Sequence, residues 1–195
     1  MEDILDVYDK KAEEKTARLC FNERPCQLIG DTIAPLPVKP GQVAKEDSKH
    51  VIKFSCVVLF AYDLDTGQRY AEVREQKDYA EFMDQLIRTY YSDKEKVILV
   101  QDNLNTHPKG SFYEHLPIER AGQLNEQIEF HFTPKHASWL NMTEIEFSAL
   151  SRQCLDRRID SIEKIRTEVQ AWQQERNKQQ VKIHWTHTQK MTSKI

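Results

Sequence analysis

Residues 96–107 have the sequence KVILVQDNLNTH, in which an apolar run gives way abruptly to polar side chains. The apolar run at 96–100 is continuous rather than alternating, which is typical of a strand buried on both faces at the centre of an α/β sheet. Asp102 follows at the sheet edge where α/β proteins open their ligand crevice. A carboxylate at this place belongs either to a binding site or to an Asx turn that caps the next helix. The spacing alone leaves both interpretations open.

The segments on either side of this run predict a mixture of strands and helices. Residues 51–62 and 69–74 are rich in β-branched and aromatic residues and are separated by the turn sequence DLDTG, which predicts a hairpin. Alternating side chains predict one more strand at 128–133. Helices are expected at 78–91, 112–116, 140–155 and 161–180. This order predicts an α/β fold with a mixed central sheet flanked by helices.

The N-terminal part of the chain is more polar. Residues 1–17 are charged and compatible with a short lead-in helix. Residues 18–28 (RLCFNERPCQL) predict a strand that ends near Asn22, because Pro25 cannot donate a backbone hydrogen bond to a sheet. We therefore divide the chain into a lead-in helix at 1–17, one domain at 18–185 and a C-terminal tail at 186–195.

Composition narrows the possible classes of function. The 195 residues carry a net charge of −3, which disfavours a dedicated nucleic-acid-binding module but allows an enzyme that meets DNA through a local basic patch. A nucleotide-binding α/β protein lacks support, because the chain has five glycines and neither a GxGxxG motif nor a Walker loop. The four scattered cysteines are expected to be reduced and buried. With no signal peptide and no long apolar run, we expect a cytoplasmic protein that does not interact with a membrane.

A second polar cluster lies at 134–147, with the sequence PKHASWLNMTEIEF. Asn141 and Glu144 are three residues apart, so we expect them to share one face near the start of a helix. Glu146 is expected to point away from Glu144. A carboxylate in a first helical turn is either a functional residue or a surface residue that complements the helix dipole.

Three stretches resemble, in order, the signature blocks of the IS630-like transposases of the Tc1/mariner superfamily. They are LCFNERPCQL at 19–28, VILVQDNLNTH at 97–107 and TPKHASWLNMTEIEFSAL at 133–150. The resemblance extends over nearly the whole chain, from about Met1 to Trp185. It implies the catalytic domain of a DDE transposase with an RNase H-like fold. It also implies three acidic residues that bind two Mg²⁺ or Mn²⁺ ions, cut DNA and join its 3′ end to a target.

The resemblance assigns the three catalytic positions to Asn22, Asp102 and Glu144. Asp102 and Glu144 match the second and third acidic residues and are the expected metal ligands. Asn22 stands where similar proteins carry Asp, and a neutral amide holds a divalent cation much less well than a carboxylate. We therefore predict impaired catalysis. Glu23 is a possible rescue carboxylate, although on a strand it would point to the opposite face.

The resemblance also implies several neighbours of the site. The near-site polar residues are Asn103, Asn105, His107, His136 and Asn141. The candidate DNA-binding residues are Lys109, Lys135 and Arg152. The two histidines are alternatively surface residues at loop junctions, and the basic residues are alternatively an ordinary solvated face.

The expected partners are the DNA of the element ends and of the target. Transposases of this kind carry helix-turn-helix domains, so a separately encoded DNA-recognition half is an expected partner, as is a second copy in a homodimer. The expected location is the nucleoid of a bacterial cell. The alternative function is a catalytically inactive RNase H-like module that binds DNA or a protein partner.

Overall fold

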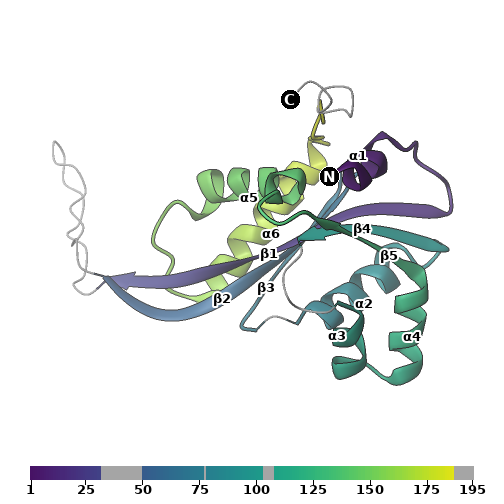
Figure 1. Ribbon diagram of the computed structural model, residues 1–195. Helices are drawn as coiled ribbons and strands as arrows, with labels where there is room; N and C mark the ends of the chain where they lie inside the picture. The colour runs from purple at the N-terminus through teal and green to yellow at the C-terminus, as the bar shows by residue number, and fades with distance from the viewer. Residues whose placement is uncertain (32–49, 77, 103–107, 187–195) are drawn as a thin grey trace.

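The computed structural model describes residues 1–31, 50–76, 78–102 and 108–186. Its centre is a five-stranded mixed sheet in the order β3-β2-β1-β4-β5 (Figure 1). The strands are β1 (Thr16–Asp31), β2 (His50–Asp63), β3 (Arg69–Arg74), β4 (Lys96–Asp102) and β5 (Ile128–Thr133). β1 runs antiparallel to β2 and parallel to β4, which in turn runs parallel to β5. The predicted hairpin is the antiparallel pair β2–β3.

β4 occupies the place that its apolar sequence predicts. It is paired on both sides, with β1 and with β5, and its residues from Val97 to Val100 are buried. Val97 and Leu99 pack into the core on one face of the sheet, whereas Ile98 and Val100 pack into the core on the other. Both faces of the strand are therefore apolar, which explains why the sequence does not alternate.

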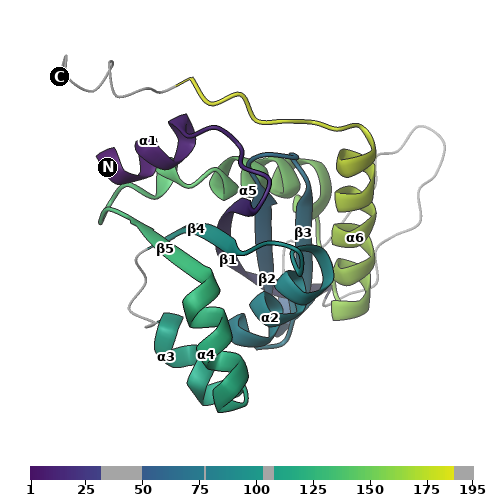
Figure 2. The same ribbon diagram turned by 90° about the vertical axis from the view of Figure 1, so that its right-hand side faces the viewer.

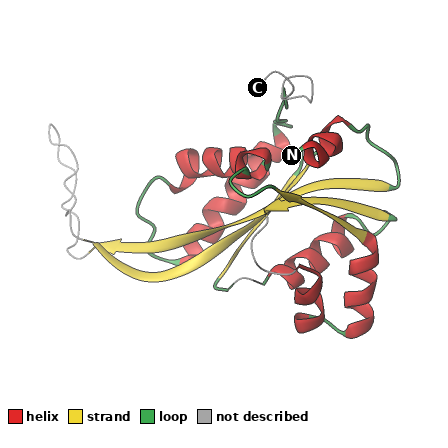
Figure 3. Ribbon diagram, in the orientation of Figure 1, coloured by secondary structure: helices red, strands yellow, loops and turns green. Residues whose placement is uncertain are grey.

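Helices cover both faces of the sheet (Figures 2 and 3). One face carries α1 (Glu2–Asp9), α5 (Thr143–Leu150) and α6 (Ile162–Lys178), whose buried residues share a core cluster. The other face carries α2 (Tyr79–Tyr90), α3 (Pro108–His115) and α4 (Ile118–Gln127), which share the second cluster. Among the described residues, no helix combines the length and the apolar character needed to cross a membrane.

The prediction that the first strand ends near Asn22 is wrong, because β1 continues to Asp31. Pro25 lies within it, opposite Val57 of β2. The pairing with β4 stops at Phe21 and Gln101, so the described part of β1 beyond Phe21 is hydrogen-bonded to a strand on one side only. A proline is tolerated on such an edge, where its missing N–H costs no sheet hydrogen bond.

Three other elements differ from the sequence-based expectation. Helix α4 was not predicted, and the short helix expected at 112–116 is α3, which begins earlier at Pro108. The helix expected at 140–155 is three pieces: a 3-10 turn at Ser138–Leu140, α5, and a π turn at Ser151–Leu155.

The predicted lead-in helix is α1, and one of its faces is part of the core. Ile4 and Val7 are fully buried, and Tyr8 donates a hydrogen bond to the carbonyl oxygen of Leu140 at 2.6 Å. The segment after α6 returns to the same region, where the Trp185 ring packs edge-on against the Tyr8 ring. The described ends of the chain therefore meet beside the loop that precedes α5.

Candidate active site

Strand alternation decides where the polar side chains at the end of the sheet point. On β1, Cys20 faces the α5 side of the sheet, so Asn22 faces it as well. On β4, Val100 faces the same side, and so does Asp102. Because β1 and β4 are parallel and Phe21 is opposite Gln101, the two next residues, Asn22 and Asp102, emerge beside each other.

Helix α5 supplies the third member of this group. The Asn22 side-chain amide donates to Glu144 Oε1 at 2.5 Å and to Asp102 Oδ2 at 3.4 Å. The Asn22 carbonyl oxygen is turned away and accepts a hydrogen bond from the backbone N–H of Glu23 at 2.8 Å. The structure thus brings together the three residues to which the sequence assigns the catalytic positions. The amide NH₂ group lies between the two carboxylates.

Two further residues hold Asp102 in place. Thr133 donates from its hydroxyl to Asp102 Oδ1 at 2.9 Å, and Asn141 donates to the same oxygen at 3.4 Å. The Asn141 amide also donates to the carbonyl oxygen of Phe21 at 2.9 Å. Asn141 is fully buried, and its hydrogen bonds to Phe21, Asp102 and Thr143 connect β1, β4 and the start of α5.

Thr133 was missed in the sequence, although a signal was present. It is the last residue of β5, and it lies directly opposite Asp102 in the parallel register. Polar residues that end adjacent parallel strands meet at the same sheet edge. Asn141 was expected on the α5 face beside Glu144, but it precedes the helix and faces the sheet.

Within the described residues, no ion pair joins Asp102 or Glu144 to a cationic side chain. The pKa of Glu144 is raised, first because the side chain is partly buried and second because the Asp102 carboxylate is close. Arg24 and the hydrogen bond from Asn22 oppose the shift but do not cancel it. A bound cation would remove this repulsion.

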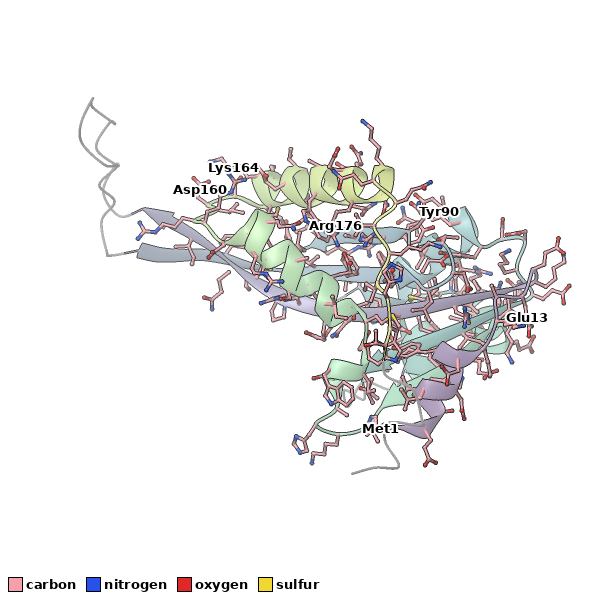
Figure 4. All side chains as sticks on the ribbon, turned by 90° about the horizontal axis from the view of Figure 1, so that it is seen from above. Met1, Glu13, Tyr90, Asp160, Lys164 and Arg176 are labelled. Atoms are coloured by element: carbon pink, nitrogen blue, oxygen red, sulfur yellow. The ribbon has the colours of Figure 1, made fainter. Side chains whose placement is uncertain are left out.

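Glu146, two residues along the same helix, is bound quite differently. It is fully buried and accepts two hydrogen bonds from Arg69, at 2.6 and 2.8 Å, and two from Arg176, both at 3.1 Å. Arg176, labelled in Figure 4, comes from α6, which covers the same face of the sheet as α5. Burial alone would raise the pKa of Glu146, but the two guanidinium groups outweigh it and lower the pKa. As expected from the sequence, Glu146 points away from Glu144.

The remaining predicted residues lie around this group or outside the described part of the chain. Asn103, Asn105 and His107 fall outside the described residues, and Lys109 lies in α3 with a side chain that is not described. Lys135 and His136 are exposed in the turn after β5. Arg152 is exposed and lines a groove of about 380 Å³ together with Arg24 and Arg157.

Glu23 is placed on the other face of the sheet. β1 and β2 keep a regular register at this point, with Asn22 opposite Phe60 and Glu23 opposite Leu59, and the only register shift lies further on at Leu28 and Ile29. Consecutive strand residues point to opposite faces, so Glu23 is directed away from Asp102 and Glu144. The geometry of β1 therefore gives no support to the rescue of the missing carboxylate by Glu23.

The donor atoms of the site suit a hard divalent cation, with one ligand missing. Carboxylate oxygens of Asp102 and Glu144 are the type of ligand that Mg²⁺ and Mn²⁺ prefer. Asn22 presents an N–H donor toward them, and rotating its amide to present Oδ1 would break the bond to Glu23. Over the described residues, no three His, Cys, Asp or Glu side chains group closely enough to hold a metal ion. The described part of the site thus offers two acidic ligands, as expected from the sequence, where the family resemblance implies three.

Comparison with known proteins identifies a family and a fold. The family model described as DDE superfamily endonuclease matches residues 18–166. No curated protein sequence matches the chain. The crystal structure of the Mos1 mariner paired end complex with Mn gives a TM-score of 0.54 at 16% identity, covering 92% of this chain and 56% of that chain. The Mos1 strand transfer complex gives 0.54 at 15% identity, covering 88% and 53%.

The chain therefore spans little more than half the length of these solved transposase chains. At such low identity the likeness establishes the fold, and it confirms the predicted RNase H-like fold with a mixed sheet flanked by helices. The family model covers most of the chain, including the two strands and the helix that carry Asn22, Asp102 and Glu144. On this evidence the chain belongs to the DDE superfamily of endonucleases.

Proposed function

We propose that the chain is the catalytic domain of a Tc1/mariner-like, IS630-like transposase, whose metal site is impaired by Asn22. The observation that carries the proposal is the convergence of Asn22, Asp102 and Glu144 at one end of the sheet, through hydrogen bonds from one amide to both carboxylates. The family is one of endonucleases, and the solved mariner complexes of the same fold are described with transposon ends and with Mn.

In this proposal Asp102 and Glu144 hold the divalent metal ions, Mg²⁺ or Mn²⁺. A pair of such ions, when bound, activates the attacking oxygen and stabilises the leaving oxygen of a phosphodiester. Thr133 and Asn141 orient Asp102 by hydrogen bonds to one of its oxygens. That leaves the other oxygen, Oδ2, facing Asn22 and Glu144.

The same proposal assigns the groove lined by Arg24, Arg152 and Arg157 to the DNA backbone. These three side chains place positive charge along the groove, and of the three Arg24 acts on Glu144 electrostatically. Phosphate contacts of this kind provide affinity without reading the DNA sequence. Lys109 and Lys135 are further proposed DNA contacts. Recognition of the element ends is assigned to a helix-turn-helix half supplied separately, and assembly to a homodimer, both in the nucleoid.

Asn22 favours the second candidate function, an RNase H-like module that binds DNA or a partner without cutting it. The Asn22 NH₂ group already donates hydrogen bonds to both carboxylates that would hold a cation. A neutral amide also leaves the site one negative charge short. We therefore expect the unaltered chain to bind DNA and to show no nicking with Mg²⁺ or Mn²⁺.

The test is Asn22→Asp, assayed for Mn²⁺ binding by electron paramagnetic resonance and for nicking of a DNA duplex. We expect Mn²⁺ affinity to rise at least about tenfold, or 1.4 kcal/mol, because the third carboxylate adds charge at the ligand position. The matched control is Asn22→Asp combined with Asp102→Asn. This double variant exchanges the amide and the carboxylate between the two positions and keeps the net charge of the original chain. It should bind Mn²⁺ no better than the original.

Two results would count against the proposal. Equal Mn²⁺ affinity for Asn22→Asp and for the double variant would show that the three positions do not form a metal site. Efficient nicking by the unaltered chain, abolished by Glu144→Gln, would keep the transposase assignment but refute the impairment by Asn22.

A further inference from the structure

Two cysteines lie opposite each other on β1 and β2, outside the group of acidic residues. Cys26 and Cys56 are register partners in the antiparallel pair, and both are free thiols. Directly opposite residues point to the same face of the sheet, with Cα atoms about 4.5 or 5.5 Å apart depending on the hydrogen-bonding position. A disulfide requires a Cα separation of about 4.4–6.8 Å. The register therefore places the two backbones at bridging distance, and the bond requires only that the Cys26 thiol turn from its contact with the Arg24 carbonyl oxygen at 3.8 Å.

The two thiols differ in access to solvent. Cys26 is half-buried and lines the groove that also contains Arg24 and Arg152, so a small oxidant can reach it. Cys56 is buried at 3% exposure. The other two cysteines have no comparable partner, since Cys20 is opposite Tyr62 and Cys154 lies in the π turn after α5. Within the described residues, Cys26 and Cys56 are the cysteines that face each other across a ladder.

We propose that Cys26 and Cys56 form a reversible cross-strand disulfide when the chain meets a peroxide. The Cys26 thiolate attacks one peroxide oxygen, which gives a sulfenic acid and one water. The Cys56 sulfur then attacks the Cys26 sulfur, the S–S bond forms, and the hydroxyl leaves as a second water. The two thiols lose two electrons and two protons in total, and hydrogen peroxide takes up these electrons and protons to become two waters. A thiol reductant reverses the change.

The bond would strengthen the part of β1 that has least support. Beyond Phe21 the described residues of β1 pair with β2 alone, and Figure 1 shows the two strands running on together beyond the rest of the sheet. Cys26 is four residues from Asn22 and two from Arg24, on the same strand face. The disulfide therefore fixes the strand that carries one corner of the proposed metal site and one side of the basic groove.

The environment of the thiols sets the conditions of the experiment. Burial raises the pKa of the Cys26 thiol to about 11, with the neighbouring Cys56 as the second cause, and burial also raises the pKa of Cys56. Since the thiolate is the nucleophile, the oxidation is slow at neutral pH. Mildly alkaline buffer with hydrogen peroxide is therefore the suitable reagent.

The test is thiol mapping of the full chain after peroxide treatment, by alkylation under denaturing conditions and mass spectrometry. Cleavage after glutamate places Cys20, Cys26 and Cys56 in separate fragments, because Glu14, Glu23, Glu46 and Glu72 bracket them, and it places Cys154 in a fourth, 147–163. We expect a linked pair of fragments, 24–46 with 47–72, while Cys20 and Cys154 remain alkylated. Reductant should restore four alkylated thiols, and the oxidised chain should unfold at a higher temperature because its unfolded state is cross-linked.

Two variants complete the design. Cys26→Ser should abolish the linked fragments and the rise in unfolding temperature, whereas Cys154→Ser, the control, should retain both. Four alkylated thiols in the oxidised original chain, or a link that joins two chains, would overturn the proposal. None of these readouts uses metal or DNA, so they are independent of the proposed transposase function.

Discussion

Glu144 and Glu146 lie two residues apart on one helix and have opposite electrostatic surroundings. Glu146 is fully buried between Arg69 and Arg176, which together donate four hydrogen bonds to it and lower its pKa. Glu144 is only partly buried, and its pKa is raised, first by that burial and second by the charge of Asp102. The neutral amide of Asn22 donates a hydrogen bond to each of these two carboxylates.

The difference separates a structural carboxylate from a candidate ligand. A carboxylate whose charge is already balanced by arginine has nothing to offer a metal ion, and removing it leaves buried positive charge. A pair of carboxylates without a cation stores repulsion that a bound cation relieves. Four variants test this contrast, starting from the largest expected effect on the free energy of unfolding.

Glu146→Ala should have the largest effect. It leaves the fully buried guanidinium of Arg69 without its carboxylate, which costs about 3–5 kcal/mol for a broken buried ion pair. Urea denaturation followed by circular dichroism measures the loss. Glu144→Ala, the same truncation two residues away, is the matched control and should cost far less. Equal losses for the two variants would remove the distinction between the two carboxylates.

Asn22→Asp should have the second-largest effect on the free energy of unfolding. Whether it destabilises or stabilises the fold should depend on the presence of metal. In a chelating buffer a third carboxylate joins Asp102 and Glu144, and we expect a loss of about 1–2 kcal/mol, since one pKa unit corresponds to about 1.36 kcal/mol. Added Mn²⁺ should restore the stability and raise it above that of the original chain at saturating concentration. Thermal unfolding with and without Mn²⁺ measures both changes, and metal-independent stability in the variant would contradict the expectation.

Glu144→Gln should have a smaller effect: a gain in the free energy of unfolding that depends on pH. Because the folded-state pKa of Glu144 is raised, its ionisation destabilises the fold, and this penalty grows as pH rises through the raised value. Below the ordinary carboxyl pKa the group is protonated in both states and the penalty is absent. The variant should therefore gain less than about 1 kcal/mol at neutral pH, because water screens a partly exposed group, and nothing in acid. A gain independent of pH would contradict this origin.

Lys164→Ala should have the smallest effect and provides the baseline for an exposed ion pair. Lys164 contacts Asp160 at 2.6 Å, with side-chain exposures of 65% and 42%, at the start of α6 (Figure 4). Such pairs contribute about 0.2–1 kcal/mol or less. A loss as large as that of Glu146→Ala in the same denaturation assay would show that burial does not explain the comparison.

The sequence predicted the features that depend on local pattern. The apolar run of β4, the alternation of β5 and the turn between β2 and β3 identified the mixed sheet. The motifs around Asp102 and Glu144 identified the family. The prediction failed for the length of β1, because a proline usually excludes a central strand, and only the sheet order shows that Pro25 lies beyond the pairing with β4.

Other features were invisible because they depend on contacts between distant segments. Glu146 and Arg69 are 77 residues apart in the chain, and nothing in either local sequence indicates a buried ion pair. The polar sequence of α4 concealed a helix with two buried residues, Ala121 and Leu124. Similarly, the opposition of Cys26 and Cys56 follows from the register of two strands that are separated by 18 residues between Asp31 and His50.

By itself the sequence determined the fold class and the family, and it gave the chemical identity of the three residues at the candidate site, including the amide of Asn22. Local periodicity predicted the fold class, whereas the family and the three positions followed from the resemblance of three motifs to transposase signature blocks. Only the tertiary structure decided that the Asn22 amide donates hydrogen bonds to both Asp102 and Glu144. It also decided that Thr133 and Asn141 orient Asp102. These facts depend on strand register and on the packing of α5 against the sheet, which no single segment of the chain encodes.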